Sequence, residues 1–76
     1  MNKERRKALE EIKTKLEDVS SDLETYRDEE LEYLDNMPES LQSGEKASAA
    51  ENAISSMDDA INSISETCNS VDEAIG

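Results

Sequence analysis

The sequence has no histidine, tryptophan or phenylalanine, and Cys68 is the only cysteine among its 76 residues. One cysteine cannot close an intrachain disulfide, and without histidine the chain lacks the usual ligands of a zinc site. A domain of this size has a marginal core unless metal, disulfides or oligomerisation support it. Because the composition excludes the first two, oligomerisation is the support that we expect.

The same absences argue against an enzyme. Without histidine, an acyl-transfer triad lacks its usual base, and Cys68 lies on an apolar helical column where burial shields a thiol. The two glycines, Gly44 and Gly76, fall at expected helix ends and not in a phosphate-binding loop. We therefore expect no catalytic residues, no cofactor and no metal site.

Long apolar runs are also missing, because no more than two apolar residues are consecutive anywhere in the sequence. This excludes a membrane-spanning segment. The lone cysteine and the absence of a charged, then apolar leader favour a cytoplasmic location.

The charge is strongly negative and unevenly distributed. Eight basic residues face twenty acidic ones, for a net charge of −12. Residues 1–15 carry six basic and three acidic side chains, whereas residues 16–76 carry two basic and seventeen acidic ones. Repulsion from most of the surface argues against nucleic acid or an anionic membrane as a direct partner. We expect a protein partner instead.

Apolar residues recur at alternating spacings of three and four in two stretches, which is the pattern of a coiled-coil seam. The first stretch runs from Leu9 to Met37 and the second from Ala47 to Ile75. Pro38 interrupts the pattern between them. The sequence predicts an all-α, antiparallel two-helix coiled-coil hairpin in one domain, 1–76. We expect one helix over about 3–36, a turn over 37–43 and a second helix over about 44–75, with Ser43 as its N-cap.

The two seams match in register if the chain folds back near residue 42. Leu16 then lies opposite Cys68, and Val19 lies opposite Ile64. The pattern also places Tyr26 and Tyr33 in the core, with their hydroxyl groups at its edge.

Glu30 interrupts the seam, because a buried carboxylate is costly. It either reaches solvent from a locally drifting seam or fixes register, as a polar seam residue can.

One hairpin cannot cover every apolar residue. The uncovered ones are Leu31, Leu34 and Leu41 near the turn, and Ala53 and Ala60 beside the second seam. A homodimer that forms a four-helix bundle would cover them. The competing interpretation is burial in a groove of another protein. Met37 and Leu41 either cap the hairpin core or form a contact tip.

A cluster of carboxylates precedes the turn and includes Asp28, Glu29, Glu32 and Asp35. It lacks the spaced ligands and central glycine of a calcium loop. Rows of carboxylates on a rod can imitate the phosphates of a duplex, so the alternative function is a nucleic-acid mimic that occupies a basic groove. The plainer interpretation is that the charge keeps the protein in solution.

The turn segment, Asp-Asn-Met-Pro-Glu-Ser-Leu-Gln over 35–42, and the Glu/Asp-x-Ala-Ile repeats that begin at Glu51 and Asp58 resemble a group of short acidic helical-hairpin proteins of phages and prophage-like elements. The resemblance covers about residues 27–76. It implies a virus- or mobile-element-encoded hairpin, in a setting where small acidic inhibitors of host proteins are common. It implies no site residues. The second helix is rich in Ser and Asn and is less acidic than the resemblance suggests.

Overall fold

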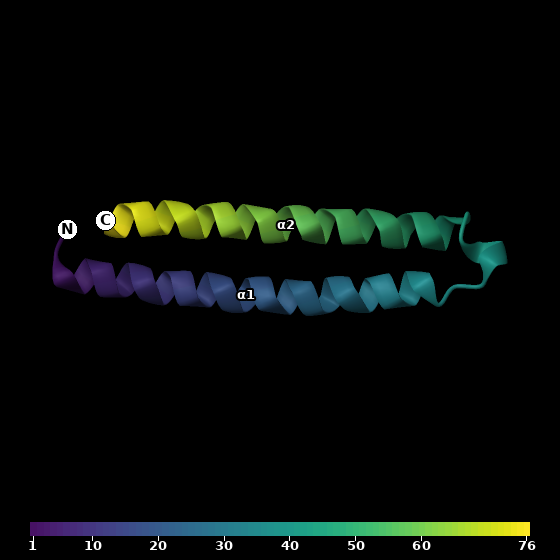
Figure 1. Cartoon of the computed structure of the whole chain (residues 1–76), viewed down its shortest axis with the longest axis horizontal. Helices are drawn as coiled ribbons and strands as arrows, with labels where there is room; N and C mark the ends of the chain where they lie inside the picture. Colours follow the sequence, from purple (N-terminus) through teal and green to yellow (C-terminus); the bar gives the residue numbers. More distant parts are fainter.

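The computed structural model describes all 76 residues and shows two long helices joined by a short turn. Helix α1 spans Lys3–Asp35, the 3-10 helix η1 spans Glu39–Leu41, and α2 spans Glu45–Ile75. The helices run antiparallel and side by side, with both termini at the end opposite the turn (Figure 1). The Cα atoms fill a rod of 59 × 15 × 12 Å. The predicted helical hairpin is therefore confirmed.

Local chemistry explains where the helices begin and end. The Asn2 side chain accepts a hydrogen bond from the Arg5 amide at 2.8 Å and so caps α1. Pro38 cannot continue α1, which ends at Asp35, and it leads into η1. The expected N-cap at Ser43 is wrong: Gly44 occupies that position. A Cβ atom at residue 44 would lie 3.3 Å from the Leu41 carbonyl oxygen, which favours glycine there.

Two ion pairs between the helices show their register. Lys13 Nζ donates to Asp72 Oδ2 at 2.9 Å, and Arg27 Nη1 donates to Asp58 Oδ1 at 3.0 Å. The residue numbers of both pairs add up to 85, so the chain folds back between residues 42 and 43. This closing point lies within one residue of the one that the sequence predicts.

The rotation of α1 about its axis differs from the prediction. The residues of α1 that face α2 are Leu9, Lys13, Leu16, Ser20, Leu23, Arg27, Glu30 and Leu34. Val19 and Tyr26, which the sequence places in the seam, are turned outward instead and do not lie in the hairpin core. The core positions expected for Tyr26 and Tyr33 are wrong, since these side chains are 61% and 48% exposed.

The hairpin buries little of its own surface. Its buried residues are Met37, Ala47, Ala50 and Cys68, and α1 contributes none of them. The alanines are the most tightly packed, with Ala47 1% and Ala50 2% exposed. Cys68 is a core residue, as predicted. Neither helix has a stretch that is long and apolar enough to cross a membrane.

Candidate functional site

An apolar column runs along the outside of α1. It consists of four large side chains seven residues apart, with exposed fractions of 45–61%: Ile12, Val19, Tyr26 and Tyr33. Seven residues are close to two helical turns, so these side chains lie in one line along the rod. Four large apolar side chains in one line along a helix are more than the scattered single apolar residues that are normal on a surface that faces only water.

From residue 47 onward, helix α2 has one face that carries no charge. After Lys46, its six charged residues occupy one arc of about 140° around the helix, at the 3.6-residue period. They are Glu51, Asp58, Asp59, Glu66, Asp72 and Glu73. The other side of α2 bears Lys46 at its start and then small residues at every seventh position: Ala53, Ala60, Thr67 and Ala74. In a chain in which 37% of residues are charged, this charge-free face stands out.

The outward column of α1 and the small-residue column of α2 lie on the same side of the hairpin. In α1, Ile12 and Lys13 follow Leu9 by three and four positions and so flank it, about 60° to one side and about 40° to the other. In α2, Asp58 and Ala60 likewise lie on opposite sides of the Ile61 position. Because the ion pairs place Lys13 and Asp58 on one face, the two uncharged columns share the other. We call their eight residues the apolar face.

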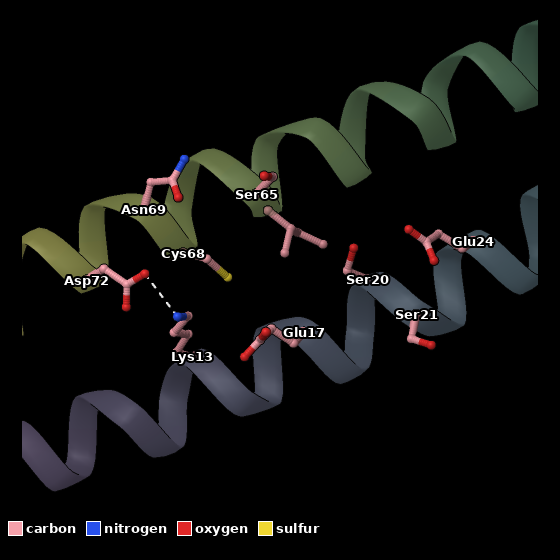
Figure 2. Close-up of a pocket in the computed structure, with 10 residues that line it drawn as sticks. Lys13, Glu17, Ser20, Ser21, Glu24, Ser65, Cys68, Asn69 and Asp72 are labelled. Atoms are coloured by element: carbon pink, nitrogen blue, oxygen red, sulfur yellow. Dashed lines mark hydrogen bonds and ion pairs between the residues drawn. The ribbon is translucent and has the colours of Figure 1, made fainter.

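The opposite face is polar and contains an open groove of about 360 Å³. Figure 2 shows Lys13 reaching across the groove to Asp72, with Ser20 and Ser65 on its walls and Cys68 directed inward. The hydrogen bond to Asp72 raises the pKa of Lys13 above its ordinary value, against a smaller opposing effect of desolvation. Hydrogen bonds to Asp58 and then to Asp28 raise the pKa of Arg27. These contacts favour the charged forms of both cations and join the two helices across the polar face.

The structure separates the two candidate residues of the turn. Met37 is buried and packs at the end of the hairpin core, whereas Leu41 in η1 is 52% exposed. The Gln42 amide donates to the Met37 carbonyl oxygen at 3.2 Å and helps to close the turn. The capping interpretation therefore applies to Met37, and only Leu41 is available for a contact tip.

The other apolar candidates occupy different faces. Leu31 is exposed, and Leu34 is half-buried in the seam. Ala53 and Ala60 are half-buried and belong to the apolar face. These four apolar candidates therefore do not form one surface, and only the alanines join the column of large side chains on α1.

The acidic candidates are exposed on the outside of α1. Asp28, Glu29, Glu32 and Asp35 all point away from α2, and Asp28 accepts hydrogen bonds from Arg27 at 3.2 Å. Glu30 is half-buried in the seam and forms no ion pair. No group of three or more carboxylate or thiol side chains has a geometry suited to a metal ion.

Sequence reasoning assigned the outward column of α1 to the hairpin seam and so missed it as surface. The signal that could have revealed it is the column beginning at Lys13. Lys13, Ser20 and Arg27 face Asp72, Ser65 and Asp58 when the register sum is 85. That complementarity of charge and size would have indicated that this column of α1, and not the column from Ile12 to Tyr33, faces α2.

Comparisons with known proteins add no assignment: no family model, curated protein or solved structure matches the chain.

Proposed function

We propose that this chain is a small acidic protein-binding module that self-associates through its apolar face. The observation that supports the proposal is the column of exposed large side chains on α1, beside a charge-free face of α2. Covering such a face removes apolar surface from water, which is the main driving force of protein association. A helical surface of a second protein molecule would match the length of the apolar face and the regular spacing of its side chains.

The module works by binding and not by catalysis. Its thiol, Cys68, is buried, and its groove is an open, mostly polar depression beside a lysine already paired with Asp72. Small-molecule sites are typically enclosed and largely apolar. The apolar face is instead an extended surface along the rod, which suits a macromolecular partner.

The resemblance to short acidic phage and prophage-like hairpins gives this module a biological setting. We propose a phage- or mobile-element-encoded protein that acts in the cytoplasm of the host cell and binds or inhibits a host protein. Glu29 borders the apolar face, because it is three residues after Tyr26. Asp28, Glu32 and Asp35 before the turn, and Leu41 at its tip, remain outward when the apolar face is covered. They would be available to a host protein with a basic surface.

Self-association is tested by light scattering coupled to size exclusion, together with thermal unfolding over a 100-fold range of protein concentration. We expect a dimer with twice the 8.5 kDa mass of one chain. The midpoint temperature of unfolding of such a dimer should rise by about 10 °C over this concentration range. This follows from mass action and an unfolding enthalpy of ~0.7 kcal/mol per residue. A mass of 8.5 kDa with a constant midpoint would refute the proposal.

The alternative function, a nucleic-acid mimic, gains support from the charge density of a dimer. Duplex DNA carries one charge per ~1.7 Å of helix axis. One hairpin has a net charge of −12 on a rod of 59 Å. This is about one charge per 5 Å, and two stacked copies would carry about one per 2.5 Å, closer to a duplex.

Salt dependence tests mimicry. A mimic should capture a basic nucleic-acid-binding protein and release it as salt rises. Capture of a partner without a basic groove, or binding unchanged in high salt, would exclude mimicry.

A further inference from the structure

We propose that a second copy of this chain covers the apolar face with its turn at the opposite end of the rod. In this arrangement α1 packs on the partner's α1, and α2 packs on the partner's α2. The inference rests on the proposed self-association and adds the direction in which the second copy lies.

The exposed area of the single hairpin indicates that a copy of equal size is needed. A compact protein of this mass exposes about 4,650 Å² by the usual scaling. This chain, of 8.5 kDa, exposes 5703 Å². The excess of about 1,000 Å² exceeds the ~800 Å² that each partner buries in a standard interface. It arises because each helix is covered on one side only, and a second hairpin, laid along the whole rod, supplies a matching area.

Two symmetric arrangements bring the apolar faces together. A two-fold axis along the rod leaves both turns at the same end and places α1 over the partner's α2. A two-fold axis across the rod puts the turns at opposite ends and places each helix over its own copy. In both arrangements neighbouring helices are antiparallel, so the helix dipoles do not distinguish them.

The distribution of charge along the rod favours turns at opposite ends. The half that contains the turn, residues 23–62, has two basic and eleven acidic side chains, for a net charge of −9. The half that contains the termini, residues 1–22 and 63–76, has six basic and nine acidic side chains, for −3. Turns at the same end would set −9 against −9. Turns at opposite ends set −9 against −3, which lowers the summed product of facing charges by roughly two fifths.

The side chains of α1 fit the same axis. The midpoint of the outward column lies between Val19 and Tyr26, near the middle of the rod. A two-fold axis at this level sets Val19 against the partner's Tyr26 and Ile12 against the partner's Tyr33. Each layer then combines one aliphatic residue with one tyrosine, so the layers have similar volume and the core can pack evenly.

The charge-free face of α2 fits this arrangement as well. Its small residues are centred within about one residue of the same level, at the spacing of the α-helix. Ala60 lies near the partner's Thr67, and Ala53 lies near the partner's Ala74. Small side chains allow helix axes to approach toward the short end of the usual range of roughly 8–10 Å. No carboxylate of α2 is brought into this contact.

Spin labels on the turn distinguish the arrangements. A label is placed at Ser40 in η1 through Ser40→Cys, in a Cys68→Ala background whose helicity is checked by circular dichroism. Turns at opposite ends predict a label-to-label distance near the 59 Å length of the rod by pulsed dipolar spectroscopy. A distance under about 30 Å, a few helix spacings, would mean turns at the same end and would overturn the inference.

A second label separates failure of the orientation from failure of self-association. Ser21 is exposed near the middle of α1 and faces away from the apolar face, so Ser21→Cys gives a distance of a few helix diameters in either arrangement. A dipolar signal from residue 21 with a short distance from residue 40 would overturn the orientation alone. No dipolar signal from either label, with a mass of 8.5 kDa, would overturn the proposed function as well.

Discussion

Replacing Val19 by lysine tests whether the apolar face is covered. In an isolated hairpin Val19 is 51% exposed, so a lysine there can keep its ammonium group in water and cover the same surface with its stem. Lysine also forms helix slightly better than valine and offsets one of the twelve net negative charges. The isolated hairpin should therefore tolerate Val19→Lys within about 0.5 kcal/mol of its stability.

A covered face predicts a much larger effect. The ammonium group would have to leave water near the middle of the interface, at a cost of about 3–5 kcal/mol per chain. At ~4–8 °C per kcal/mol for a chain of this size, the unfolding midpoint falls by at least about 12 °C, or the dimer dissociates.

The matched control is Thr14→Lys. This substitution makes the same change from a β-branched residue to lysine on α1, at an exposed position that faces away from the apolar face. We expect a change within about 0.5 kcal/mol, measured by urea denaturation at equal protein concentration. If Val19→Lys is as mild as Thr14→Lys, nothing covers Val19 and the reasoning fails.

Three further predictions concern the hairpin itself. Ala50 is 2% exposed and has no room for a larger side chain. Ala50→Leu should therefore cost about 1–3 kcal/mol, and a neutral result in urea denaturation would contradict the tight packing near the turn. Of the two turn residues, only Met37 is buried. Met37→Ser should cost about 2 kcal/mol or more and Leu41→Ser less than about 0.5 kcal/mol, so equal losses in thermal unfolding would contradict this difference. The pKa of Lys13 is raised in the folded chain by its bond to Asp72. Its ion pair therefore stabilises the fold fully below the unfolded pKa of about 10.4 and less as pH rises above it. The difference in unfolding midpoint between the wild type and Lys13→Met should be constant from about pH 6 to 9 and shrink in more alkaline buffer.

The heptad pattern predicted the hairpin and its closing point because both follow from the spacing of apolar residues along the two helices. Leu16 and Cys68 face the seam as expected, and the closing point near residue 42 follows from the spacing of the apolar columns. Pro38 marked the turn because proline cannot continue a helix. The predicted cap at Ser43 missed by one residue, a difference that local turn geometry decides.

The rotation of α1 was not predictable from the same pattern. The spacing of apolar residues indicates all the surface that a helix buries. It does not distinguish the part covered by the other helix of the hairpin from the part covered by another molecule. The prediction assigned the column from Ile12 to Tyr33 to the seam with α2, whereas in the structure Lys13 and Arg27 pair with α2 and this column is exposed. The acidic residues and Leu41 as contact sites depend on a partner and stay predictions.

The constant register between the helices also sets the order in which the chain can fold. The inner ion pair, Arg27 with Asp58, closes a loop of 31 residues, and the outer one, Lys13 with Asp72, closes a loop of 59. A near doubling of loop length costs only about 0.6 kcal/mol of chain entropy, and it costs less still once the inner turns are paired. Ala47 and Ala50, the most tightly packed residues, lie closest to the turn, where closure is cheapest. Folding should therefore start at the turn and zip toward the termini, and amide hydrogens should exchange fastest at the two ends that close last.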